Sequence, residues 1–122
     1  MKIEKFEDLD CWKKARELAN LIYDLTNQRS FVKDSQLRGQ MRDAAGSVMH
    51  NIAEGFDSGS DAEFVRFLKI SRRSASEVQS ELYLALDRNY ITSTQLEKAY
   101  QKATETKRLI NGLIAYLHRN KK

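Results

Sequence analysis

The sequence predicts an all-α protein, an antiparallel up-down four-helix bundle. Apolar residues recur every three or four positions through four long segments, which is the spacing of one helix face. The 122 residues include no proline, so no ring interrupts a long helix. The links between the later segments are short, which forces the helices they join to run antiparallel. No strand pattern or internal repeat competes with this interpretation.

We expect one domain over residues 1–122, with helices over about 9–27, 35–54, 61–89 and 93–119. The first eight residues are expected to be extended, with Phe6 as an anchor and Asp8 as the N-cap of the first helix. Residues 27–33 are polar around one apolar patch. They are interpreted as a connector whose Phe31 ring packs back on the bundle.

Residues at the ends of the later helices carry recognisable signals. Gly55 is expected to be the glycine that follows the second helix. Ser60 and Glu63 match a capping box at the start of the third helix, and Thr92 and Gln95 match a second one at the start of the fourth.

The residue constellations that would carry catalysis are missing, so no enzyme, cofactor, metal site or small-molecule substrate is predicted. Two histidines and one cysteine cannot form a usual zinc site. The E-x-x-H pairs of a di-iron bundle, a P-loop and a G-x-G-x-x-G turn are all missing from the sequence. Cys11 lies beside Trp12 on an apolar helix face, where an inert packing thiol is expected.

Three features favour a cytoplasmic protein with no membrane contact. No apolar run approaches the roughly 18 residues that a membrane span needs. The N-terminus is charged throughout and has no apolar core of a signal peptide. A lone cysteine cannot form an internal disulfide, which fits a reducing compartment.

The formal net charge of +4 is unevenly distributed. Residues 90–122 hold seven lysines and arginines against two glutamates, which favours an anionic partner but also suits the C-terminal end of a helix dipole. A basic stripe on the third helix can follow a phosphate backbone, or it can be a solvated face paired with glutamates. The candidate nucleic-acid-binding residues are Arg66, Lys69, Arg72, Arg73, Lys102, Arg108 and Arg119.

Two strips that repeat every seven residues lie opposite the apolar stripes of the second and third helices. Small residues let another backbone approach closely, and exposed apolar residues at this spacing indicate a second packing surface. The alternative is the scatter of apolar residues found on most protein surfaces. We expect self-association, with Gly39, Gly46, Ala53, Ile70, Glu77 and Leu84 as the candidate interface.

Polar residues line the edge of the second helix and interrupt the stripe of the third. Semi-buried polar groups need hydrogen bonds, so we expect a polar seam that fixes the register of the two helices. Its predicted members are Ser47, Asn51, Glu54 and Ser74, with Ser71 nearby. The alternative interpretation makes Glu54 a ligand-binding carboxylate.

The chain also resembles the four-helix-bundle family named after proteins encoded in intervening sequences of bacterial 23S ribosomal RNA genes. The resemblance covers nearly the whole chain, and its most specific part is N-I-A-E-G at residues 51–55. The other matching residues are Phe6, Leu9, Trp12 and Ala15; Gln40, Arg42, Ala44, Ala45 and Ser47; Glu63, Phe64 and residues 66–68; Ser74, Glu77 and residues 86–91.

This resemblance implies a small cytoplasmic bacterial protein that forms a ring-like homo-oligomer, typically a pentamer, and has no known enzymatic activity. It also implies similarity to accessory proteins of diversity-generating retroelements, which bind nucleic acid and a reverse transcriptase. Two positions depart from the family pattern. Asp43 stands where a basic residue often follows Arg42, and Arg73 replaces a common glycine.

The sequence and the resemblance together lead to one functional hypothesis and one rival. The first is a non-enzymatic oligomeric bundle that binds RNA, DNA or a nucleic-acid-processing partner. The rival is a protein–protein scaffold with no direct nucleic-acid contact.

Overall fold

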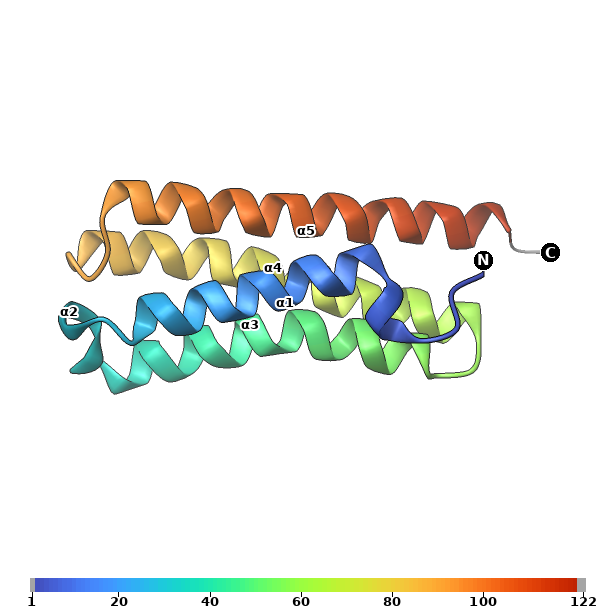
Figure 1. Cartoon of the computed structure of the whole chain (residues 1–122), viewed down its shortest axis with the longest axis horizontal. Helices are drawn as coiled ribbons and strands as arrows, with labels where there is room; N and C mark the ends of the chain where they lie inside the picture. Colours follow the sequence, from blue (N-terminus) through green and yellow to red (C-terminus); the bar gives the residue numbers. More distant parts are fainter. Residues whose placement is uncertain (1, 121–122) are drawn as a thin grey trace.

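Four long helices lie side by side in the computed structural model, which describes residues 2–120 (Figure 1). The chain begins with a short 3-10 turn, η1 (Phe6–Asp8), and continues into α1 (Asp10–Thr26). A one-turn helix, α2 (Arg29–Val32), precedes the long helices α3 (Ser35–Phe56), α4 (Asp61–Asp87) and α5 (Ser93–Arg119). Lys121 and Lys122, which contribute to the C-terminal excess of charge, lie outside the described residues.

The long helices close around one apolar core. α3 packs against α1 and α4, and α5 packs against the same two helices, so α1 and α4 lie diagonally across the bundle. Each long helix contributes fully buried side chains, such as Leu18, Val48, Leu68 and Ile110. None of the helices in residues 2–120 is both long and apolar enough to cross a bilayer.

The start of the chain differs from the expectation. Residues 6–8 form a 3-10 turn instead of an extended segment, and Asp8 belongs to that turn. Leu9 occupies the N-cap position of α1 and makes no side-chain capping bond. The turn is held by an edge-to-face contact between the rings of Phe6 and Trp12, whose centroids lie 5.2 Å apart.

Gly55 was predicted to follow the second helix, and this prediction is wrong. α3 continues to Phe56, so Gly55 lies inside its last turn and is buried. A Cβ atom added at Gly55 would lie 2.7 Å from the Cβ of Phe67 and 3.0 Å from the ring of Phe64. The glycine therefore permits the close approach of α3 and α4, rather than a left-handed turn.

α4 ends two residues earlier than expected, at Asp87, and Asn89 then adopts a left-handed φ of 62°. The side chain of Ser60 caps α4 by accepting from the backbone N–H of Glu63 at 3.2 Å. At the start of α5 the capping box is complete, because Thr92 and Gln95 each accept from the other's backbone N–H.

The connector before α3 closes one end of the bundle. Phe31, in α2, is fully buried, and its ring centroid lies 4.9 Å from that of Tyr90. The hydroxyl of Ser30 donates to the carbonyl of Tyr90, and the hydroxyl of Tyr90 donates to the carboxylate of Asp34. Asp34 also caps α3 by accepting from the N–H of Leu37. These contacts tie α2 to the α4–α5 link.

Candidate nucleic-acid interface

A polar depression of about 440 Å³ lies between α4 and α5. Four cationic side chains line it, and none of its lining residues is acidic. We call it the α4–α5 groove, and its lining residues are Lys69, Arg72, Arg73, Ser76, Lys107 and Asn111.

Neutral polar groups hold two of these cations in place. The guanidinium of Arg72 donates from Nη1 to Oδ1 of Asn111 at 2.7 Å. The ammonium of Lys107 donates to Oγ of Ser76 at 3.1 Å and to Oε1 of Gln79 at 2.7 Å. Among the described residues, neither cation forms a salt bridge with a carboxylate, so an approaching anion does not have to displace a paired carboxylate.

The α-helix places the remaining groove cations in register. Lys69 and Arg73 are four residues apart on α4, so they lie about 6 Å apart along the helix axis on one outer face. Both side chains are exposed. The groove therefore presents an exposed pair of cations on α4 and a pair braced across α4 and α5.

Arg66 belongs to the same helix but is already engaged. Its guanidinium makes two hydrogen bonds with the carboxylate of Glu63, at 2.9 and 3.0 Å, and lies 4.6 Å from the ring centroid of Phe67. Hydrogen bonding from Arg66 lowers the pKa of Glu63 below its ordinary value. This exposed pair leaves Arg66 less free than the groove cations to meet a phosphate.

The predicted cations of α5 do not join the groove. Lys102 donates to Oε1 of Glu17 at 2.7 Å, on the side of α5 that packs against α1, and this bond lowers the pKa of Glu17. Arg108 lines a separate apolar hollow beside Asp8 and Asp10. Arg119 is exposed in the last turn of α5. The seven predicted residues thus do not form one stripe, because they face different sides of the bundle.

Lys107 and Asn111 were not among the predicted binding residues, although the structure places both in the groove. The signal that can find them is their position on α5: they are four residues apart, and Lys107 is one turn past the buried residue Ala103. It must then be decided whether the face of α5 that carries these two residues lies next to α4 or next to α1. That choice depends on the order of the helices around the core, which the spacing alone does not reveal.

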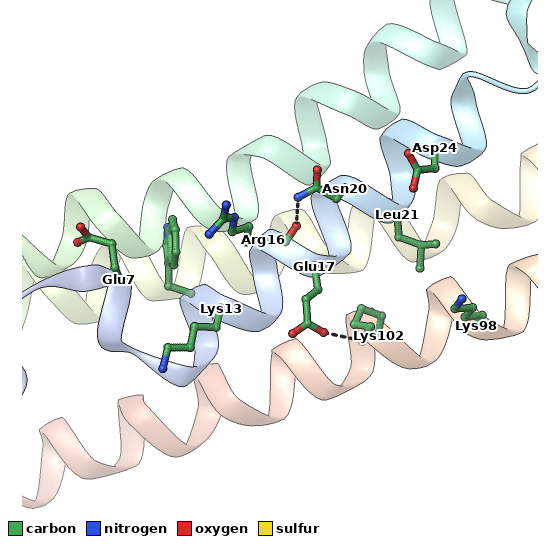
Figure 2. A pocket seen from close by; sticks show the side chains of 10 residues that line it. Glu7, Lys13, Arg16, Glu17, Asn20, Leu21, Asp24, Lys98 and Lys102 are labelled. Atoms are coloured by element: carbon green, nitrogen blue, oxygen red, sulfur yellow. Dashed lines mark hydrogen bonds and ion pairs between the residues drawn. The ribbon is translucent and has the colours of Figure 1, made fainter.

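A larger hollow of about 780 Å³ lies along α1 and α5, and its lining has mixed charge (Figure 2). Figure 2 shows Glu17 reaching toward Lys102, and Asn20 further along α1, where its side-chain amide donates to the carbonyl of Arg16. Its lining contains four cations and three carboxylates. The cations are Lys13, Arg16, Lys98 and Lys102, and the carboxylates are those of Glu7, Glu17 and Asp24. Because the charges nearly balance, this surface suits a polyanion less well than the α4–α5 groove.

Three of the four predicted seam residues lie together between α3 and α4. The hydroxyls of Ser47 and Ser74 are 2.8 Å apart, and Asn51 donates to both the carbonyl and the hydroxyl of Ser47. Ser71 is fully buried and donates to the carbonyl of Val48 at 2.6 Å. Glu54 is exposed, and no hydrogen bond among the described residues links it to the seam.

The predicted self-association strips lie on the outside of α3 and α4. Gly39 is exposed, and nothing within 4 Å would meet a Cβ added there, whereas one added at Gly46 would meet His50 at 3.6 Å. Ala53 and Ile70 are partly exposed, Glu77 is exposed, and half of Leu84 (50%) is exposed.

Burial shifts the pKa values of two titratable groups that lie outside the groove. Burial raises the pKa of the Cys11 thiol to about 12, so the thiolate nucleophile is suppressed. Burial, and secondly the charge of Glu77, raise the pKa of half-buried Glu81 to about 7. Oε1 of Glu81 is buried and has no hydrogen-bond partner among the described residues.

The packing of the helices and the residues that line the groove define the class of protein. It is a helical bundle with a cationic groove on one pair of helices, and no carboxylate lines that groove. Residues 7–112 match the family model described as 23S rRNA-intervening sequence protein. The chain therefore belongs to that family, which confirms the resemblance.

A solved structure supports the same assignment. The chain is similar to a protein with unknown function from the S23 ribosomal protein family of Bacteroides thetaiotaomicron VPI-5482. The two chains are 27% identical and superpose with a TM-score of 0.78, over 85% of this chain and 97% of the other. No curated protein matches this chain at a significant level.

Proposed function

We propose that this protein is a non-enzymatic helical bundle that binds nucleic acid through the α4–α5 groove. The observation that carries the proposal is a polar depression lined by four cations and no carboxylate. Phosphate contacts by lysine and arginine supply most of the sequence-independent affinity for nucleic acids. Membership in a family named after a ribosomal RNA intervening sequence is consistent with such a partner.

The geometry of the groove suits a chain of phosphates better than a single anion. Lys69 and Arg73 form a row along α4, while Arg72 and Lys107 are fixed beside them by neutral partners. A row of cations can contact successive phosphates, and each contact releases a condensed counterion.

Salt dependence of binding tests this proposal. Fluorescence anisotropy with labelled single-stranded and duplex oligonucleotides should show affinity falling between about 50 and 200 mM salt. Charge reversal of Lys69 and Arg73 to glutamate should weaken binding at least about tenfold and flatten the salt dependence. Lys13→Glu combined with Lys98→Glu, on the α1–α5 side of the bundle, changes the net charge by the same amount and is the matched control, which should change binding far less.

An affinity that is independent of salt, or equal losses in the groove and control variants, would contradict phosphate binding at the groove.

The rival function, a protein–protein scaffold without nucleic-acid contact, is favoured by one observation: the half-exposed Leu84 on the outer side of α4. Under that alternative, charge reversal in the groove leaves the biological activity intact.

We further propose that the antiparallel up-down bundle works in the cytoplasm as a ring-like homo-oligomer, with a pentamer as the expected size. The exposed strips on α3 and α4 support self-association, because Gly39 leaves open space and Leu84 offers apolar surface. Light scattering tests this directly against the 14.1 kDa mass of one chain. A stable single-chain mass at high protein concentration would overturn the oligomer.

A further inference from the structure

The α4–α5 junction continues from the cationic groove to a pair of aromatic side chains, the exposed Tyr83 and the partly buried Tyr100. Gln79 accepts from Lys107, and it donates from Nε2 to Oγ1 of Thr104 at 2.9 Å and to the carbonyl of Tyr100 at 3.2 Å. Tyr83 follows Gln79 by one turn of α4. A ladder of hydrogen bonds thus links the groove to the backbone of Tyr100, whose ring contacts that of Tyr83.

Tyr83 is a large exposed aromatic side chain at the end of this ladder. Half of it (51%) is exposed, and its ring meets that of Tyr100 at a centroid distance of 5.9 Å and an interplanar angle of 71°. Contact with Tyr100 limits the orientations of the Tyr83 ring. A ring restricted in this way loses less side-chain entropy when a ligand stacks on it.

The spacing puts Tyr83 on the same side of α4 as the groove. Arg72 and Tyr83 are eleven residues apart, which is three turns of an α-helix and about 16 Å along its axis. This length matches a short run of nucleotides. Asp87 is one turn beyond Tyr83, whereas the groove cations lie on the side of Tyr83 that leads back to Lys69.

We infer that the α4–α5 groove takes single-stranded nucleic acid, with one unpaired base stacked on Tyr83 and the adjoining phosphates on the groove cations. This inference rests on the proposed function. A basic track with an aromatic platform is the usual arrangement for single strands, because every unpaired base offers a face for stacking. Bases in a duplex are already stacked and paired, so they cannot reach Tyr83 without unpairing.

The test compares variants on three probes of one sequence: single-stranded RNA, single-stranded DNA and the DNA duplex. Tyr83→Ala should weaken binding to the single strands at least about fivefold and leave the slope of affinity against salt unchanged, since no charge is lost. Tyr83→Phe should bind as the natural protein does, because stacking needs the ring and not the hydroxyl. Binding to the duplex should be weaker and insensitive to Tyr83→Ala.

Tyr23→Ala is the matched control. Tyr23 is equally exposed (48%) but lies on α1, diagonally across the bundle, so its loss should leave single-strand binding unchanged. Tyr83→Leu preserves an apolar contact for Tyr100 without an aromatic face, and should lose affinity as Tyr83→Ala does. The RNA and DNA probes identify which single strand is preferred.

One outcome would overturn the proposed stacking on Tyr83 and leave the proposed function standing. In that outcome, Tyr83→Ala and Tyr83→Leu leave single-strand binding unchanged, while charge reversal of Lys69 and Arg73 abolishes it. Equal losses on single strands and duplex would also overturn it. No salt-dependent binding to any probe would overturn both proposals.

Discussion

Two glycines in this bundle differ in how much space surrounds their backbone. Gly55 and Gly112 both lie inside long helices, where glycine costs about 1 kcal/mol relative to alanine. Phe64 and Phe67 fill the space next to Gly55, whereas nothing lies within 4 Å of a Cβ added at Gly112. The same substitution should therefore have opposite effects at the two sites.

Gly55→Ala should lower the free energy of unfolding by about 1–3 kcal/mol, because the new methyl group overpacks the α3–α4 contact. Gly112→Ala should raise it by up to about 1 kcal/mol through helix propensity. Urea denaturation followed by circular dichroism measures both. Equal effects of the two changes would show that the close approach of α3 and α4 at Gly55 is not what requires glycine.

Glu81 makes the stability depend on pH. Its pKa is raised from 4.5 to about 7, so the folded state holds the proton more tightly than the unfolded state does. The stabilisation from this group is fully present below pH 4.5 and is lost as the pH rises through about 7.

Glu81→Gln should therefore raise the melting temperature at pH 8 and have little effect near pH 4, where the natural carboxyl is neutral. The gain at pH 8 is roughly 1 kcal/mol, after a discount for the solvent that screens a half-exposed side chain. Thermal unfolding at both pH values measures it. Glu77→Gln should give a smaller gain, since the charge of Glu77 is the second cause of the shift. A gain that is the same at pH 4 and pH 8 would exclude Glu81 titration as its origin.

At the scale of helices, several of the residues that carry the family resemblance turn out to be packing residues. Arg42 donates from Nε to Oγ1 of Thr26 at 2.9 Å, next to Arg38, which donates to the Thr26 carbonyl at the end of α1. The side chain of Asn51 donates a hydrogen bond to the carbonyl of Ser47, and the missing side chain of Gly55 leaves room for Phe67. These residues join α3 to α1 and α4, and none of them lines the α4–α5 groove.

The hydroxyls of Ser47 and Ser74 should contribute a coupled stabilisation to the α3–α4 contact. Ser74→Ala alone should cost about 1 kcal/mol of unfolding free energy, because it leaves the partly buried Ser47 hydroxyl with one partner fewer. Once Ser47 is alanine, the same change should cost less. A double-mutant cycle in urea gives the coupling energy, and strictly additive losses would contradict a direct bond.

At the scale of the whole molecule, the helical periodicity was enough to locate the four long helices. What it missed depends on neighbours that are distant in sequence. The position of Gly55 inside α3 depends on Phe67, and the short helix α2 depends on the burial of Phe31 against Tyr90. Such tertiary contacts override local signals, including the glycine that usually ends a helix.

The candidate site was only partly predictable for the same reason. Lys69, Arg72 and Arg73 share one helix, so their spacing alone groups them. Lys107, on α5, also lines the groove, whereas the predicted Lys102 does not, because it faces Glu17 on α1. A sequence pattern assigns residues to faces of single helices, but the order of helices around the core decides which faces meet.

The placement of the single tryptophan has a practical consequence for anyone studying this protein in solution. Trp12 packs against Phe6 at the beginning of α1, and α1 lies diagonally opposite the helix that carries Tyr83. Its intrinsic emission should therefore follow the melting of the bundle. Once the exciting light absorbed by the added bases is corrected for, the same emission should not change when an oligonucleotide binds, so one spectroscopic channel monitors structural integrity during every titration.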